Sequence, residues 1–326
     1  NVIIPTTGIS QPAGLTISAN DILDADRSLT LAATNASITL RDNSAVHSIS
    51  SSFSALTLAL TGAATFNLTD SNALTLSSAS SGGDVNLTAT GADLTLSANT
   101  TISGTLNLTT TGTGNVVIPT TGFTQSAGLT IDANDLIDTD RTITLSATNA
   151  NISLRNATSS MAWTSSFSSL VLSLTGGGDF ALTDTNALTL TSASTSGNAS
   201  FTTTNADLTL SADPAVTGNL SLITTGTGNV IIPTTGISQP AGLTISANDF
   251  LDTDRTLTLA ATNADITLRN SASSMVYTTS FSNLVLSLTG GGDFALTDTN
   301  ALTLTSASTS GNASFTTTNA DLTLSA

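Results

Sequence analysis

The chain has 326 residues, enough to bury a substantial core, and 39% of them are hydrophobic, which argues against disorder. It contains no Cys, Lys or Glu, and its formal net charge is −16. Such an acidic surface repels nucleic acid, and a disulfide scaffold is excluded. No run of eighteen apolar residues and no signal-peptide pattern is present, so we expect no membrane insertion.

One long segment is repeated along the chain. "NVIIPTTG" begins at Asn1, returns as "NVVIPTTG" at Asn115 and again as "NVIIPTTG" at Asn229, a constant spacing of 114 residues. The copies are 1–114, 115–228 and the incomplete 229–326. No linker separates them, so we expect one continuous domain that belongs to a longer chain.

A shorter rhythm runs through each copy. In chain order the first copy contains "LTI" at 15–17, "LTL" at 29–31, "ITL" at 38–40, "LTL" at 56–58, "FNL" at 66–68, "LTL" at 74–76, "VNL" at 85–87, "LTL" at 94–96 and "LNL" at 106–108. Alternation of apolar and polar residues places the two apolar side chains on one face of a β-strand and the polar one on the other. Gly, Asn, Asp and Ser between these units are typical of turns.

These units predict an all-β fold, a parallel β-helix (β-solenoid) without significant α-helix. A coil of about 19 residues would stack each strand on its equivalent one coil later, giving six coils per copy. Leucines would then form inner columns and threonines outer ones. Three β-sandwich modules of 114 residues are the alternative, but each copy holds more strand units than such a module needs.

The units "GADLTLSA" at 91–98, "GTLNLTTTGTGN" at 104–115 and "GNLSLITTGTGN" at 218–229 resemble the repeats of filamentous-haemagglutinin-like proteins. These are large secreted adhesins of Gram-negative bacteria, and their family fold is a right-handed parallel β-helix. The resemblance covers nearly the whole chain and implies a right-handed solenoid that is secreted to the cell surface.

The densest polar motif is "DILDADR" at 21–27, repeated as "DLIDTDR" at 135–141 and "DFLDTDR" at 249–255. Carboxylate oxygens are ligands that Ca²⁺ prefers. The candidate ligands are Asp24, Asp26, Asp138, Asp140, Asp252 and Asp254. We favour a polar turn over a calcium site, because the EF-hand and glycine-rich nonapeptide patterns are absent, and we expect no cofactor. Arg41, Arg155 and Arg269 each follow an Asp of this motif by 20 residues, which predicts ion pairs with Asp21, Asp135 and Asp249.

The chain has a single histidine, His47, whose equivalents in the other copies are Met161 and Met275. A catalytic centre built on it would exist once and be absent twice. We therefore expect no enzyme activity and assign no catalytic residue.

Aromatic residues recur at fixed places. Core packing is expected for Phe53, Phe167, Phe281, Phe66, Phe180 and Phe294. A further position holds Ile49, Trp163 and Tyr277 in the three copies. Because its side chain varies so freely, we expect this position at the surface or in a turn, with Trp163 and Tyr277 available for copy-specific contacts.

These features favour a structural or adhesive shaft of a large extracellular bacterial surface protein or fibre. Its partners would be further copies of itself, in lateral or end-to-end assembly, or a host or cell-surface glycan or protein bound through regions outside this segment. The alternative is an ice- or glycan-binding β-solenoid that uses outward Thr arrays.

Overall fold

The computed structural model describes residues 1–23, 28–138, 142–251, 256–271 and 274–325. Within these residues the chain forms 34 β-strands and no helix. The described part of the chain therefore contains no helix that could cross a membrane. Two compact units are present, Asn1–Ala157 and Thr158–Ala326. Their boundary lies inside the second sequence copy, and continuity of the solenoid across it stays a prediction.

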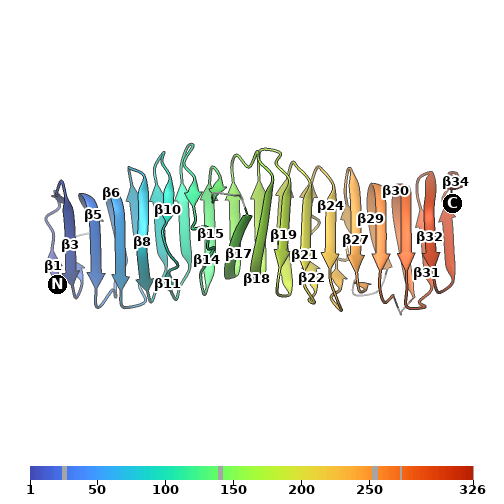
Figure 1. The fold of residues 1–326 in the computed structure, drawn as a ribbon, viewed down its shortest axis with the longest axis horizontal. Helices are drawn as coiled ribbons and strands as arrows, with labels where there is room; N and C mark the ends of the chain where they lie inside the picture. The colour runs from blue at the N-terminus through green and yellow to red at the C-terminus, as the bar shows by residue number, and fades with distance from the viewer. Residues whose placement is uncertain (24–27, 139–141, 252–255, 272–273, 326) are drawn as a thin grey trace. The chain divides into compact units, whose positions relative to one another are not determined.

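The first unit is a β-solenoid whose strands stack side by side from β1 to β17 (Figure 1). Its strands are β1 (Val2–Ile3), β2 (Ile9–Ser10), β3 (Gly14–Ala19), β4 (Ile22–Leu23), β5 (Ser28–Leu40), β6 (His47–Leu60), β7 (Phe66–Asp70), β8 (Leu74–Ser81), β9 (Val85–Ala89), β10 (Leu94–Leu96), β11 (Thr101–Ile102), β12 (Leu106–Thr110), β13 (Val116–Val117), β14 (Phe123–Thr124), β15 (Gly128–Ala133), β16 (Leu136–Ile137) and β17 (Thr142–Leu154).

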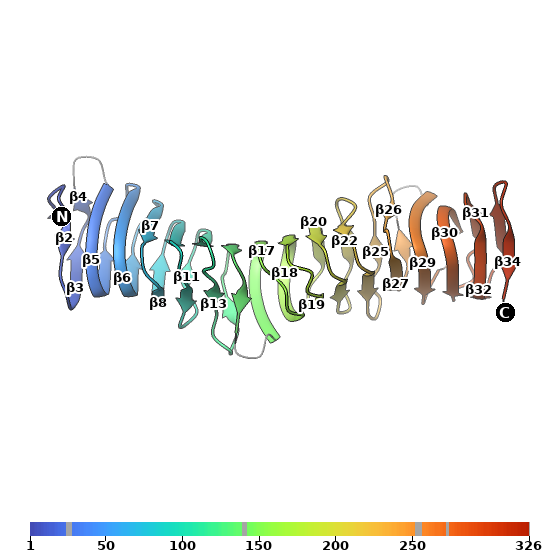
Figure 2. The same cartoon turned by 90° about the horizontal axis from the view of Figure 1, so that it is seen from above.

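The second unit repeats this architecture from β18 to β34 (Figure 2). Its strands are β18 (Met161–Leu174), β19 (Phe180–Asp184), β20 (Leu188–Thr195), β21 (Ala199–Thr203), β22 (Leu208–Leu210), β23 (Ala215–Val216), β24 (Leu220–Thr224), β25 (Val230–Ile231), β26 (Ile237–Ser238), β27 (Gly242–Ala247), β28 (Phe250–Leu251), β29 (Thr256–Leu268), β30 (Met275–Leu288), β31 (Phe294–Asp298), β32 (Leu302–Thr309), β33 (Ala313–Thr317) and β34 (Leu322–Leu324).

The alternating apolar and polar residues of the sequence become alternating buried and exposed side chains in the strands. In β9 the side chains of Val85, Leu87 and Ala89 are buried, while the two between them are half-exposed. β7 and β12 lie parallel to β9 on its two sides, in register, so the inward side chains of successive coils stack on one another. The parallel β-solenoid predicted from the sequence is therefore confirmed. Each fully buried Leu or Ile contributes roughly 1.5–3 kcal/mol relative to exposure, but only when the neighbouring coils cover it.

The coils are slightly longer than the expected length. In the first unit one inner column is built from Leu29, Ile49, Leu68, Leu87, Leu108, Ile131 and Ile152, each paired with the next. Ile152 lies 123 residues after Leu29 and six pairings away, which is about 20.5 residues per coil. One 114-residue copy is therefore nine residues shorter than six coils and makes about five and a half coils. The expected number of six coils per copy differs from the structure.

This offset moves equivalent residues to different sides of the solenoid. Ile152 stands 114 residues after Ile38, yet Ile38 belongs to another column, between Ile17 and Leu58. The second unit shows the same relation independently. There a column runs through Met161, Phe180, Ala199, Leu220, Leu243, Ala264 and Leu284, again 123 residues in six pairings. The copy equivalent of Met161 is Met275, which lies nine residues before Leu284 and outside that column.

Paired cysteines test this register, because the chain has no native Cys. Asn107→Cys with Thr130→Cys should form a disulfide on mild oxidation, since the two residues are register partners on adjacent coils at a spacing of ~4.8 Å. Asn107→Cys with Thr144→Cys is the matched control and should stay reduced. Non-reducing gels measure the cross-linking, and a first pair that stays reduced, or a control pair that cross-links, would contradict the register of these strands.

Candidate functional site

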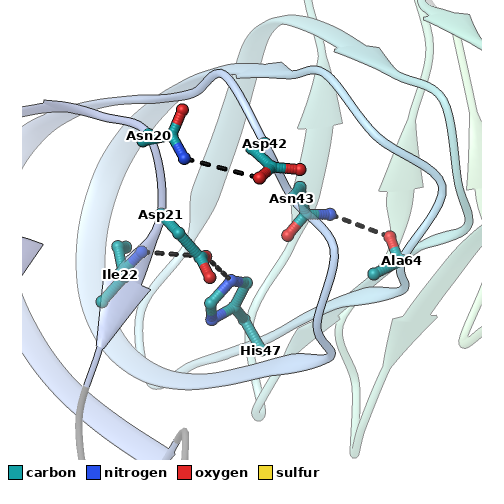
Figure 3. A network of polar contacts seen from close by, with 7 residues as sticks. All are labelled: Asn20, Asp21, Ile22, Asp42, Asn43, His47 and Ala64. Carbon is teal, nitrogen blue, oxygen red and sulfur yellow. Dashed lines mark hydrogen bonds and ion pairs between the residues drawn. The ribbon is translucent and has the colours of Figure 1, made fainter. Parts of the chain in front are cut away.

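The one histidine is part of a buried hydrogen-bonded pair in the first unit (Figure 3). His47 begins β6, and its Nε2 lies 2.8 Å from Oδ1 of Asp21, which directly precedes β4. The imidazole is 0% exposed and the carboxylate group 9% exposed. The backbone N–H of Ile22 also donates to Oδ1 of Asp21, at 2.9 Å. The pair therefore joins segments that are 26 residues apart in sequence.

Two amide contacts surround this pair in Figure 3. Asn20 Nδ2 donates to Oδ2 of Asp42 at 3.4 Å, and Asn43 Nδ2 donates to the carbonyl of Ala64 at 2.9 Å. The partners are 22 and 21 residues apart, about one coil in each case. The network thus connects consecutive coils at one corner of the solenoid.

A carboxylate that orients an imidazole is one half of a catalytic acid–base arrangement. Here, however, the imidazole has no exposed surface, so a substrate reaches it only if the coil opens. Met161 and Met275 are equally buried at the equivalent positions, with 3% and 1% exposed. The arrangement fits a role in packing and coil-to-coil contact.

A second set of buried polar residues occurs in every copy and was missed at the sequence level. The carboxylates of Asp70, Asp184 and Asp298 are each 0% exposed. Oδ2 of Asp184 accepts hydrogen bonds from the Ser165 hydroxyl and from the N–H of Phe167, at 2.8 Å for the latter, and Oδ1 accepts the N–H of Asn186 at 2.8 Å. Asp70 and Asp298 repeat this pattern. Each carboxylate ties its own turn to the previous coil.

The signal for these residues is present in the alternation. In "LTD" at 68–70 the Leu points inward and the Thr outward, so the Asp two residues after the Leu must point inward as well. An inward Asp needs hydrogen-bond donors, which the structure supplies from a Ser or Thr hydroxyl and two backbone N–H groups.

The calcium candidates fall mostly outside the described residues, which is the case for Asp24, Asp26, Asp140, Asp252 and Asp254. Asp138 is described and is buried, with 5% exposed. The described residues contain no group of three or more acidic or histidine side chains arranged to hold a metal ion.

The variable aromatic position lies in the core. Ile49 is 3% exposed, Trp163 2% and Tyr277 0%, so the expectation of a surface or turn position is wrong. Trp163 packs edge-on against Phe180, with ring centroids 4.9 Å apart, and Tyr277 packs against Phe294 at 4.8 Å. The core therefore accepts an aliphatic, an indole or a phenol side chain at this position. The six recurring phenylalanines, Phe53, Phe66, Phe167, Phe180, Phe281 and Phe294, are all buried as well.

The arginines bind across coils, with partners other than those expected. Arg155 forms an ion pair with Asp132, and its Nη2 donates to the carbonyl of Thr110 at 2.6 Å, 45 residues earlier. Arg269 makes the same 2.6 Å contact with the carbonyl of Thr224. Arg41 donates to the Ser18 hydroxyl at 3.3 Å. The side chains of Arg155 and Arg269 therefore reach over two coils, whereas Arg41 contacts the adjacent coil.

No protein-family model matches the chain, and neither curated proteins nor solved structures gave a match. The fold and the coil-to-coil contacts define its class. It is a repetitive parallel β-solenoid whose described buried polar groups hold the coils together.

Asp184→Asn tests this role. The carboxamide offers one acceptor oxygen where the carboxylate offers two, so one buried backbone N–H loses its partner. The free energy of unfolding should therefore fall by roughly 1–3 kcal/mol. The measurement is urea-induced unfolding followed by circular dichroism. Asp265→Asn is the control, because Asp265 is exposed and copy 2 carries Asn151 at this position. Equal effects of the two variants would contradict the assignment.

Proposed function

We propose that this chain is a structural shaft of a large extracellular bacterial surface protein of the filamentous-haemagglutinin-like kind, with adhesion as the purpose of the whole protein. The observation that carries the proposal is the uninterrupted parallel pairing of successive coils within each unit. Buried polar side chains join successive coils, as Asp70, Asp184 and Asp298 do.

Composition supports an extracellular location. A chain without Cys cannot be trapped by disulfides during export, and a chain without Lys offers trypsin-like proteases only its six Arg residues. The repeat style described above supports the same assignment. The proposed partners are further copies of the chain, or a host-surface glycan or protein bound by other regions of the full protein. No enzyme activity, nucleic-acid partner or cofactor belongs to the proposal.

Immunogold labelling of intact producing cells tests the location. An antibody raised against residues 1–157 should label the outer surface of non-permeabilised cells, and brief protease treatment of intact cells should remove the label. Labelling that requires permeabilisation would refute the extracellular assignment. An antibody against a cytoplasmic protein of the same cells is the control.

Resistance to trypsin tests the structural role. In the native protein, cleavage after Arg155 and Arg269 should be at least about tenfold slower than in urea-unfolded protein, because both side chains are bound to carbonyls 45 residues earlier. Mass spectrometry of timed digests identifies the cleaved bonds. Rapid native cleavage at these two residues would show that the coils open too readily for a durable shaft.

A further inference from the structure

The outer face of the second unit contains a groove with a volume of about 520 Å³. Its floor and walls come from β24, β27, β29, β30 and β32, five consecutive strands of one side of the solenoid. This volume lies in the range of small-ligand sites. The groove is independent of the shaft role proposed above.

Two parallel rows of outward side chains line the groove. One row contains Asn219, Asn263 and Asn283, with Gly242 between the first two. Gly242 has no side chain, and the amide of Asn219 lies over it. The Gly242 N–H donates to Oδ1 of Asn219 at 2.9 Å, and a Cβ at this residue would meet the same oxygen at 2.7 Å.

The second row contains Ser221, Thr244, Asp265 and Val285, which are register partners on successive coils. Leu284 pairs with Leu304 but Val285 pairs with Ser306, so Thr305 is an extra residue at a β-bulge beside the end of this row. The rows therefore present amide, hydroxyl and carboxylate groups at the coil spacing of ~4.8 Å.

Several of these polar groups have hydrogen-bonding capacity left for a ligand. Asn283 Nδ2 donates to Oδ1 of Asn263 at 2.8 Å, which leaves Oδ1 of Asn283 and Nδ2 of Asn263 without a partner among the described residues. The carboxylate of Asp265 is exposed and likewise has no hydrogen bond or ion pair within the described part of the chain.

Two groove residues are specific to the third copy. Asp265 replaces Asn151 of copy 2 and Ser37 of copy 1, and Asn283 replaces Ser169 and Ala55. These two changes add a carboxylate and an amide to the lining, and Asn219 and Ser221 also differ from their equivalents one copy earlier, Thr105 and Asn107. The solenoid does not need either residue, since copy 2 folds with the alternatives.

The lining selects the chemistry of the ligand. Side-chain amides, hydroxyls and a carboxylate are hydrogen-bonding partners for sugar hydroxyl groups. The groove contains one acidic and no basic side chain, and the chain carries a formal charge of −16, so a cationic ligand is favoured over an anionic one. Regular spacing of the rows suits a ligand that is itself a linear repeat.

We propose that this groove binds a linear amino-sugar oligosaccharide, with Asp265 holding a free ammonium group and Asn263 and Asn283 hydrogen-bonding to ring hydroxyls. The binding is non-covalent and involves no chemical step.

Isothermal titration calorimetry of the full chain with a glucosamine oligomer tests the proposal. The expected result is binding that weakens by about tenfold or more in Asp265→Asn and measurably in Asn283→Ser. Both variants install the residues of copy 2, so folding is retained, and circular dichroism checks this. An N-acetylglucosamine oligomer of equal length, which lacks the charge, should bind the unmodified chain more weakly and be insensitive to Asp265→Asn.

Asp42→Asn is the charge-matched control, because it removes the same charge in the first unit, far in sequence from the groove. Its affinity for the glucosamine oligomer should equal that of the unmodified chain. The proposal is overturned if no binding is detected at millimolar oligomer, if Asp265→Asn binds as tightly as the unmodified chain, or if Asp42→Asn weakens binding to the same extent, which would indicate unspecific charge attraction.

Discussion

Everything in this structure depends on the contact between one coil and the next. A single coil of about 20 residues is too small to surround its own leucines, so its apolar side chains are buried only when coils lie above and below. Parallel pairing keeps the coils in register and stacks aliphatic side chains of successive coils on one another, as in the column from Leu29 to Ile152. Polar groups follow the same rule, since each inward Asp accepts hydrogen bonds from the previous coil and Arg155 and Arg269 bind carbonyls two coils earlier.

Exchanges between the copies have different consequences inside and outside the solenoid. His47 in one copy and Met161 or Met275 in the others occupy the same kind of buried place, and Trp163 replaces Ile49 without leaving the core. Such exchanges change the size or polarity of a core side chain and leave the strand pairing as it is. Exposed exchanges, such as Asn151 to Asp265, change the chemistry offered to solvent and leave the packing untouched.

The fold was predictable from the sequence because period-two alternation and fixed repeats are local signals. The Leu-Thr-Leu units gave the strands and the inward leucines. The same alternation contained the buried Asp70, which we overlooked because an acidic residue next to a turn is usually exposed. The places of Trp163 and Tyr277 do not follow from the sequence, because variation between copies is common at exposed positions and here it occurs at a buried one.

Neither the groove nor the number of coils per copy could be predicted from the sequence. Paired residues in successive coils are separated by 19 residues in some places, as for His47 and Phe66, and by 23 in others, as for Leu106 and Leu129. The separation depends on how each corner turns, which composition does not specify. Asn263, Asp265 and Asn283 share a face because of that register, which the sequence does not specify.

The mismatch between 114 residues and a whole number of coils has an evolutionary consequence. Repetitive genes gain and lose copies by recombination between identical stretches. In a solenoid that continues from copy to copy, one additional copy would turn everything after it by nearly half a revolution, whereas two additional copies would bring it back close to the original facing. It therefore matters whether the number of added copies is odd or even, as well as how many there are. Odd and even variants of the same protein would present their downstream surfaces, including any groove like that around Asp265, on opposite sides.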